Sequence, residues 1–496
     1  MTPTPAPHER VRVLHDAQPS PQARYVLYWM IAQRRTRSNH ALGRAADWAR
    51  HLDVPLLVFE PLGVAYEHAS VRFHRFVIDG MRDNAAACDA KGVRHLAYVQ
   101  PDAKAGRGLL AALSEHAAVV ITDDHPVHPY PKLIDAASVH VQTRFESVDA
   151  CGLFPIRATP KLFTTAYSFR RFLQKSLPER ITQHPHPDPL RKVKDMPRAV
   201  VPKTILDRWP ELRRGIDVDL TTLPIDHNVE ATETVGGADA GRTRMRTFIR
   251  DQLADYAEAR NHPDANGVSH LSPYLHFGHV GAHELFSALT KQEDWVPEEL
   301  DTKADGRRAG WWGMSESAEA FADQFITWRE LGFNTCVHLP DTYRSFDSLP
   351  DFAQRTLAAH SHDPRPHAYS LETLERAQTA DEVWNAAQRQ LVREGVIHNY
   401  LRMNWGKRIL EWSATPHEAL ERLIHLNDKY ALDGRDPNSY SGILWCLGRN
   451  DRAWGPERPI FGTVRYMTSQ NTKRKVRMKA YLERFGPEAS LPGLET

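Results

Sequence analysis

Cysteine is scarce in this sequence, and the few cysteines lie far apart. The chain has 496 residues but only four cysteines, and no two of them form a C-x-x-C pair. This excludes the usual zinc and iron–sulfur motifs, and the 26 histidines form no H-E-x-x-H motif either. Dispersed cysteines without a pairing pattern are typical of a reducing compartment. We therefore expect a cytoplasmic protein, associated with the nucleoid in a bacterium, that binds no metal.

Long apolar runs, an excess of one charge and phosphate-binding loops are also missing. No stretch of about 18 apolar residues occurs, which excludes a membrane-spanning helix. The 63 basic and 62 acidic residues give a net charge of +1, which excludes a general polycation but permits a local basic patch. No G-x-G-x-x-G or Walker motif follows the first apolar run, so the N-terminal part carries no standard phosphate-binding loop.

The pattern of apolar residues divides the chain into four parts. Residues 1–24 are rich in proline and lack the apolar core of a secretory signal, which predicts a disordered leader. Residues 25–147 alternate short apolar runs with amphipathic stretches, which predicts a Rossmann-like α/β domain with a parallel sheet. Residues 148–242 predict a long, partly irregular connector with short helices. Residues 243–485 show the three- and four-residue apolar spacing of an all-helical domain.

Five motifs in the helical half carry a family resemblance. They are YAEARNHPDANGVSHLSPYLHFGH at 256–279, WNAAQ at 384–388, LRMNWGKRILEW at 401–412, LNDKYALDGRDPNSYSG at 426–442 and FGTVRYM at 461–467. In this order and spacing the chain resembles the class II cyclobutane pyrimidine dimer DNA photolyases of the photolyase/cryptochrome family. The resemblance is strong over 245–480 and weaker over 25–145, where YWMIAQRRTRSNHAL resembles the family's first strand and loop.

The resemblance implies a function, a cofactor and a partner. It implies light-driven repair of pyrimidine dimers in DNA, by electron transfer from excited, reduced FAD bound in the helical domain. It leaves room for a second, antenna chromophore, a deazaflavin or a folate, whose identity the sequence does not give. The alternative is a cryptochrome-type blue-light receptor that binds flavin without repairing DNA. We expect UV-damaged DNA as the partner of a monomer, without a membrane or an obligate protein partner.

The resemblance places the flavin against two of the motifs. It assigns FAD binding to Tyr256, Arg260, Ser269, Leu271, Ser272, Asn427, Asp433 and Gly434. By itself, SHLSPYLHFG also suits an ordinary helix with Ser272 as N-cap and Pro273 at the first helical position. Beside the ring, the resemblance implies an ion pair of Arg402 with Asp433, although such a pair can equally be structural. It places Asn427 opposite flavin N5, where an amide can rotate to donate or to accept a hydrogen bond.

Three tryptophans predict an electron path. Trp405 and Trp412 are seven residues apart on one predicted helix, which places them on one face about 10 Å apart along the axis. Trp384 lies on another predicted helix that could pack between them. The resemblance implies hopping from the flavin to the surface in the order Trp405, Trp384, Trp412. Core packing is the alternative, since it explains most buried tryptophans.

The resemblance also implies a pocket for the lesion. A dimer must leave the duplex to reach the flavin, which requires an apolar wall with few polar anchors. The resemblance assigns Asn261, Met403 and Trp445 to this pocket, with Trp445 stacked on the flipped bases. Glu330, in ITWRELGFN, would hydrogen-bond the dimer and steady its radical anion; the alternative is a surface glutamate paired with Arg329. The implied catalytic set is Glu330, Asn427, Arg402 and Asp433.

A basic segment near the C-terminus predicts DNA binding. Residues 449–479 hold nine lysines and arginines against two acidic residues, with aromatic residues between them. Basic residues interleaved with aromatics suit a DNA backbone and an unpaired base. We predict phosphate contacts by Lys473, Arg474 and Lys475, and we expect Arg465 to fill the gap left by the flipped dimer. A solvated helix is the alternative.

Some positions depart from the family pattern. Asn404 stands where tyrosine is usual, Thr463 stands where lysine is usual, and the stretch 293–314 looks inserted. None of these changes removes a flavin or electron-path candidate. They leave the lesion preference open.

Overall fold

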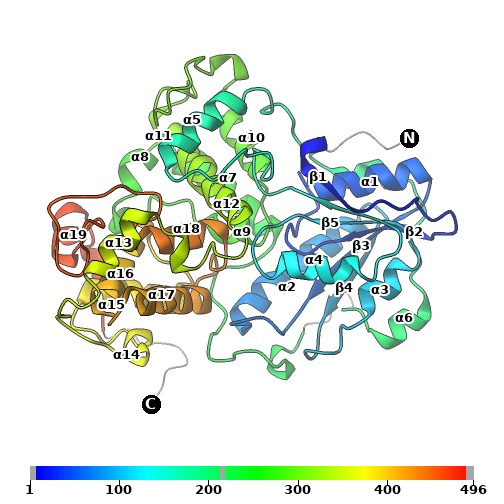
Figure 1. Ribbon diagram of the computed structural model, residues 1–496. Helices are drawn as coiled ribbons and strands as arrows, with labels where there is room; N and C mark the ends of the chain where they lie inside the picture. Colours follow the sequence, from blue (N-terminus) through cyan, green and yellow to red (C-terminus); the bar gives the residue numbers. More distant parts are fainter. Residues whose placement is uncertain (1–6, 213–217, 488–496) are drawn as a thin grey trace.

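The computed structural model describes residues 7–212 and 218–487 and shows an α/β part beside a larger helical part (Figure 1). The strands are β1 (Val11–His15), β2 (Tyr25–Trp29), β3 (Leu56–Leu62), β4 (Arg94–Val99), β5 (Ala117–Asp123) and β6 (Arg144–Val148). They form one sheet in the order β1-β6-β5-β2-β3-β4, in which only β1 and β6 pair antiparallel. The predicted, mainly parallel sheet is confirmed.

The central strands are apolar throughout because both faces of the sheet are covered. All five residues of β2 are buried. Val26 and Tyr28 lie in one core with helix α1 (His40–Leu52). Leu27 and Trp29 lie in another core with α3 (Leu109–Ser114) and α4 (Tyr130–Ser138). Continuous apolar strands are what a parallel sheet buried on both faces requires.

The start of the described chain differs from the expected leader. Strand β1 pairs with β6, with Val11 opposite Val148. Arg10 is buried; its guanidinium donates to the Asp149 carboxylate at 3.0 Å and to the Leu153 carbonyl at 2.6 Å. The expectation of disorder is therefore wrong for this segment, because sheet hydrogen bonds and a buried ion pair hold it. Residues 1–6 of the expected leader lie outside the described residues.

The connector contributes to the cores of both parts. It contains α5 (Ala166–Ser176) and α6 (Lys203–Arg208), with short 3-10 turns at Pro189–Val193 and Leu220–Thr222. Phe163 and Phe169 pack in one core with Phe248 of the helical part, and Phe76 of α2 (Val71–Asp89) joins the same core. Ile205 of α6 packs instead with the sheet. The connector therefore fixes the two parts to each other, and the boundaries at 147 and 242 stay predictions.

The rest of the chain is helical, as predicted. Its helices are α7 (Ala238–Asp251), α8 (Tyr256–Ala259), α9 (Ser272–His276), α10 (Ala282–Gln292), α11 (Glu316–Ala322), α12 (Arg329–His338), α13 (Asp351–Ala359), α14 (Leu371–Glu375), α15 (Glu382–Glu394), α16 (Asn399–Trp412), α17 (Pro416–Tyr430), α18 (Pro437–Trp445), α19 (Ser469–Lys475) and α20 (Lys479–Arg484). A π-helix, Asp323–Trp328, joins α11 to α12. Further 3-10 turns are His8–Arg10, Pro263–Ala265, Pro297–Glu299 and Phe346–Ser348. One core lies between α15, α16, α17 and α18, and a second between α7, α10 and α11.

The stretch 293–314 packs onto α10. Trp295 and Trp312 lie against Phe286, at ring-centroid distances of 5.7 and 5.6 Å. The Trp295 indole N–H also donates to the Trp312 carbonyl. These contacts make the stretch part of the second helical core. Within the described residues, no helix combines the length and the apolar character needed to cross a membrane.

Candidate active site

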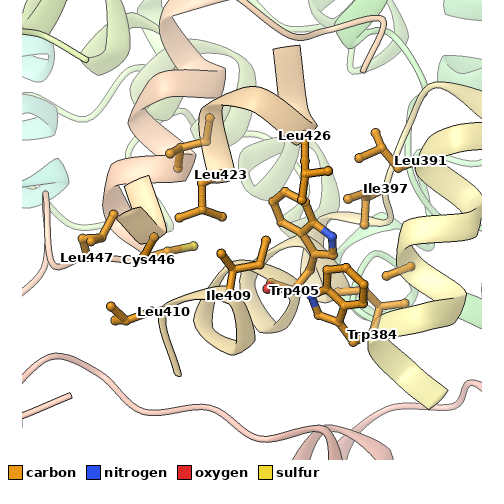
Figure 2. Packing of buried hydrophobic residues seen from close by; sticks show 14 of the residues in the cluster. Trp384, Leu391, Ile397, Trp405, Ile409, Leu410, Leu423, Leu426, Cys446 and Leu447 are labelled. Atoms are coloured by element: carbon orange, nitrogen blue, oxygen red, sulfur yellow. Dashed lines mark hydrogen bonds between the residues drawn. The ribbon is translucent and has the colours of Figure 1, made fainter. Parts of the chain in front are cut away.

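Helices α15 and α16 bring the three predicted tryptophans together. Trp384, Trp405 and Trp412 are each at most 2% exposed. The Trp384 and Trp405 rings are nearly parallel, with centroids 6.3 Å apart and planes 4° apart, and Figure 2 shows them side by side in the core. The Trp384 and Trp412 rings meet edge to face at 5.4 Å. Trp384 thus lies between the other two, which is the predicted arrangement.

The surroundings of the three indoles differ. Trp384 Nε1 donates to the backbone carbonyl of Trp405 at 3.1 Å, and Trp405 Nε1 donates to Gln388 Oε1 at 3.0 Å. Trp412 Nε1 has no partner among the described residues. Beyond Trp412 lies the partly buried ring of Tyr369, at 5.0 Å between centroids. The aromatic contacts therefore continue from the core toward the surface.

The Arg402–Asp433 ion pair is present. Arg402 lies on α16, three residues before Trp405, and its guanidinium donates to the Asp433 carboxylate at 2.9 Å. Asp433 belongs to the turn between α17 and α18. The next residue, Gly434, has no room for a side chain, since a Cβ there would lie 2.9 Å from the Asn427 carbonyl oxygen and 3.0 Å from that of Ala431. The backbone of the turn therefore packs closely against the end of α17, and the ion pair joins the turn to α16.

The Asn427 amide is fixed rather than free to rotate. Its Nδ2 donates to Asp428 Oδ1 at 2.9 Å and to Ser439 Oγ at 2.8 Å. A carboxylate only accepts, so the amide nitrogen must face Asp428. The Asn427 side-chain oxygen takes no hydrogen bond from the described residues and is left to accept one. This corrects the expectation that the amide switches between donor and acceptor.

The SHLSPYLHFG segment does not form the ordinary cap that was the alternative prediction. Helix α9 starts at Ser272, the capping position is Leu271, and no side chain caps the helix. The exposed Ser272 hydroxyl is therefore not used by the helix. The Ser269 carbonyl accepts from Arg244 Nε at 2.8 Å, an arginine of α7 that the sequence prediction missed.

The SHLSPYLHFG segment, 269–278, packs against the DGRDPN turn, 433–438, in the second helical core. Tyr256 and Leu271 are buried in the same core as Leu432. Arg260 lies 5.7 Å above the Tyr256 ring. His276 Nδ1 lies 3.4 Å from Asp436 Oδ2, which joins α9 to the start of α18. Two motifs more than 150 residues apart are thus packed against each other, as the prediction of one site requires.

Glu330 lies on α12, a helix that packs against the start of α18, where a Cβ on Gly332 would lie 2.8 Å from the Pro437 backbone. It is 4% exposed, and its carboxylate accepts from the backbone N–H groups of Leu153 at 2.6 Å and Phe154 at 3.1 Å. Burial raises the pKa of Glu330 to about 7, against the lowering effect of these N–H groups and of Arg329. Arg329 donates to the Cys151 carbonyl at 2.9 Å. The structure therefore gives Glu330 backbone partners in the connector in place of a surface ion pair, and its contact with a dimer stays a prediction.

Trp445 and Arg465 are brought together, and Asn261 is not joined to them. Trp445 is partly buried, and its ring has two cationic neighbours. Lys407 Nζ lies 4.9 Å from the ring centroid, and Arg465 Cζ lies 5.7 Å from it. Arg465 also lies 3.9 Å from the Trp454 ring. Asn261 is exposed and makes no side-chain hydrogen bond to a described residue.

Acidic partners modify the predicted basic surface. Arg465 is bound by both carboxylate oxygens of Asp451, at 2.8 and 3.2 Å. Lys473, Arg474 and Lys475 are all exposed on α19, and Lys473 pairs with Glu382. Arg474 and Lys475 make no side-chain ion pair with a described residue. Two of the three predicted phosphate ligands are therefore unneutralised.

Several characterised proteins are similar to this chain over nearly its full length. The deoxyribodipyrimidine photo-lyase of Methanothermobacter thermautotrophicus is 34% identical over 96% of this chain and 98% of its own. That of Potorous tridactylus is 31% identical over 97% of this chain and 85% of its own. The chain belongs to the deoxyribodipyrimidine photolyase family. No protein-family model matches the chain.

Solved photolyase structures have the same fold. A bacterial class III photolyase from Agrobacterium tumefaciens superposes with a TM-score of 0.69 at 16% identity, over 95% of this chain and 88% of that one. A Synechocystis cryptochrome gives 0.68 at 15% identity, over 95% and 90%. At such identities the likeness concerns the fold alone. It includes both photolyases and cryptochromes, so the fold does not separate repair from light sensing.

The groups that the chain leaves unused fit a flavin in this photolyase. Arg402 Nε is buried without a hydrogen-bond partner. The Asn427 side-chain oxygen and the Ser272 hydroxyl are likewise not engaged by the described residues. A cation, a fixed acceptor and a free hydroxyl suit an anionic ring with an N–H group and a phosphate-bearing tail. No three His, Cys, Asp or Glu residues in ranges 7–212 and 218–487 form a group that could hold a metal.

Sequence reasoning missed two residues in the tryptophan chain. Gln388 is the last residue of WNAAQ and lies one helical turn after Trp384, so spacing alone could have identified it. Tyr369 lies outside the recognised motifs. Its position depends on a tertiary contact between the segment before α14 and the end of α16, which no local pattern reports.

Proposed function

We propose that this photolyase repairs cyclobutane pyrimidine dimers in DNA with light and bound FAD. The observation that carries the proposal is the series of ring contacts from Trp412 through Trp384 to Trp405. Trp405 lies on α16, the helix that also holds Arg402. An ion pair of Arg402 with Asp433 and a chain of oxidisable rings meet there within one helical turn. Core packing alone would not require an ion pair at the inner end of stacked indoles.

We propose that the flavin is held by the residues that the resemblance indicates, among which Ser272 and Asn427 also carry groups that the described residues leave unused. They are Tyr256, Arg260, Ser269, Leu271, Ser272, Asn427, Asp433 and Gly434. When bound, the reduced flavin supplies a light-excited electron for the dimer and takes it back after the ring has split. Arg402 would balance the negative charge of the reduced ring, with Asp433 fixing its guanidinium. Asn427 would hold the N5 proton, because its oxygen is fixed as an acceptor.

We propose that Trp445 and Met403 form the wall for the flipped dimer. Extrusion of a dimer costs less than that of a paired base, and an aromatic face stabilises the extruded bases. Trp445 is only partly buried, which supports contact with a ligand. Arg465, held by Asp451, would occupy the space left in the duplex. Glu330 is not part of this proposal, because its carboxylate is bound by Leu153 and Phe154.

A repair assay tests this function directly. The purified protein is reduced, mixed with DNA that contains thymine dimers, and illuminated with blue light; dimer loss is measured against a dark sample. We expect one FAD per chain and light-dependent dimer loss. The absorption spectrum of the extracted chromophores identifies any antenna pigment in the same preparation. Flavin photochemistry without dimer loss by the fully reduced protein would instead indicate a light receptor.

A further inference from the structure

The two inner indoles of the tryptophan chain both donate to amide carbonyl oxygens. Trp405 Nε1 donates to Gln388 Oε1 at 3.0 Å, and Trp384 Nε1 donates to the Trp405 backbone oxygen at 3.1 Å. Gln388 and Trp384 are 0% exposed and Trp405 is 2% exposed. Water therefore has little access to these N–H groups. The outer indole, Trp412, has no acceptor among the described residues.

The orientation of the Gln388 amide follows from its partner. An indole N–H can only donate, so the amide oxygen must face Trp405 and the amide nitrogen must point away. Gln388 Nε2 is buried and has no hydrogen-bond partner in the described part of the chain. A buried donor without a partner costs stability, but an apolar residue at this position would instead leave the buried Trp405 N–H without its acceptor. The glutamine therefore serves the indole at the expense of its own amide nitrogen.

We propose that Gln388 is a positioning residue that gives the Trp405 indole N–H an acceptor which stabilises oxidised Trp405 without removing its proton. The inference rests on the electron path proposed above. Trp405 gives one electron to the photoexcited, oxidised flavin and becomes a positively charged radical, whose N–H is far more acidic than that of neutral indole. An amide oxygen accepts the hydrogen bond but takes no proton near neutral pH. The N–H bond therefore stays intact, and the positive charge stays mobile.

The acceptor of Trp384 has the same property. One electron passes from Trp384 to Trp405, and then one passes from Trp412 to Trp384. Each inner indole so returns to its neutral form with its proton still bound. The positive charge then rests on Trp412, whose Nε1 has no hydrogen-bond acceptor among the described residues. A base beside Trp405 would remove the proton at the first step and trap the charge there.

The test places such a base beside Trp405. Gln388→Glu supplies a carboxylate at the same position, and Gln388→Met removes the acceptor without adding a base. Gln390→Glu is the matched control, because Gln390 is buried on the same helix but bonds to Tyr481 and not to an indole. Transient absorption of each flavin-loaded protein distinguishes protonated from deprotonated tryptophan radicals. Spectra are taken from about pH 6 to about pH 9, so that a buried carboxyl with a raised pKa still ionises.

We expect protonated radicals at the early times in the parent, Gln388→Met and Gln390→Glu proteins, with a slower first electron transfer in Gln388→Met, whose Trp405 indole N–H has lost its acceptor. In Gln388→Glu we expect a deprotonated radical at the first step and a loss of about tenfold in lasting flavin photoreduction, which corresponds to about 1.4 kcal/mol added to the barrier of the next hop. Deuterated solvent should slow the early step only in this variant.

The outcomes separate this inference from the proposed function. A Gln388→Glu protein with the parent's radical spectra and photoreduction yield at every pH would overturn the role of Gln388. A Gln388→Met protein with the parent's rate of first electron transfer and the parent's photoreduction yield would overturn it too, which keeps the test decisive if the glutamate variant does not fold. A flavin-loaded parent that forms no tryptophan radical at all would reject the electron path itself, and the role of Gln388 with it.

Discussion

At the residue scale, Glu330 is a buried carboxylic acid, and its burial disfavours the ionised form. Its pKa is raised to about 7 by burial, from an ordinary value of 4.5. A carboxyl with a raised pKa in the folded state contributes stability that is fully present below pH 4.5. This contribution falls as the pH rises and is lost above about pH 7. Glu330 should therefore contribute more to the stability of the connector in weakly acidic solution than in neutral solution.

The first prediction concerns substitutions of Glu330. Glu330→Ala should lower the free energy of unfolding by about 2–4 kcal/mol, because two buried N–H groups lose their acceptor. Glu330→Gln keeps one acceptor but cannot ionise, so the parent–Gln difference should change by up to about 3 kcal/mol from about pH 4.5 to about pH 7. Urea unfolding at several pH values measures both effects. Repair per folded molecule should stay near the parent value. A loss of repair much larger than the loss of folded protein would show instead that Glu330 contacts the dimer.

The second prediction concerns Trp384, the one indole that contacts both others. Trp384→Phe should slow photoreduction of the oxidised flavin by about tenfold or more, since about 1.4 kcal/mol added to a hopping barrier already costs tenfold. Repair by chemically reduced protein should change little, because that electron does not pass through Trp384. Trp48→Phe, a buried tryptophan of α1, is the control. Equal photoreduction by all three proteins would leave the tryptophans a packing role only.

The residues that sequence could and could not place differ in their surroundings. Helical spacing placed Trp405 and Trp412 on one face of a helix, whereas the Arg402–Asp433 pair and the order through Trp384 came from the family resemblance, since these contacts join separate elements. The backbone partners of Glu330 were not predicted, because α12 is buried along residues 329–336 and has no polar face to reveal which way a side chain points. The missing N-cap at Ser272 has a different cause: capping depends on backbone angles that residue identity only favours.

At the scale of elements, Arg72 of α2 joins the α/β part to the two helices that carry Trp384 and Asn427. Its guanidinium donates to the carbonyls of Leu391 and Val392 at the end of α15, at 3.3 and 2.5 Å, and of Tyr430 at the end of α17, at 2.6 Å. Its Nε donates to the Glu230 carbonyl at 3.0 Å. The last carbonyls of a helix lack internal partners and carry partial negative charge, so one cation satisfies both helix ends.

The third prediction is that Arg72→Met lowers stability by about 3 kcal/mol or more, because several charge-assisted hydrogen bonds are lost and helix-end carbonyls stay buried. The effect should appear as a lower thermal midpoint and as faster proteolysis near the ends of α15 and α17. Arg82→Met, at an exposed position of the same helix paired with Asp79, is the control and should change the midpoint little. Similar midpoints for both variants would show that the sheet and the helices are held together by apolar packing alone.

The elements of the sheet show what local pattern can and cannot predict. Strands β2, β3, β4 and β5 were visible as apolar runs because they are buried on both faces. Strand β1 was missed because its residues are only half buried or exposed and stand in a proline-rich stretch. Its partner β6 lies more than 100 residues further along, so its hydrogen bonds are invisible locally. Edge strands are in general the elements with the weakest apolar signal.

At the scale of the whole molecule, a net charge of +1 conceals a concentration of positive charge on one element. Helix α19 lies on the helical part, at the end of the molecule away from the sheet (Figure 1). Arg474 and Lys475 are exposed there, whereas Glu382 offsets Lys473. A long duplex that contacts phosphates through α19 would run across the helical part. Binding would then be local and electrostatic in a nearly neutral protein.

The last prediction follows from this distribution of charge. Replacing both Arg474 and Lys475 by Ala should weaken binding to damaged and undamaged DNA alike, because phosphate contacts carry no sequence information. The slope of log affinity against log salt should fall by about 2, since each phosphate contact contributes about 0.9. Lys473→Ala should lower the slope by clearly less than the contribution of one phosphate contact, since Glu382 already neutralises this lysine. The control replaces Lys104 and Arg107, two exposed basic residues of the α/β part, and removes the same charge from the far side. If both double variants shift the slope equally, net charge and not α19 governs binding; if only the α19 variant does, α19 is part of the surface that holds the duplex.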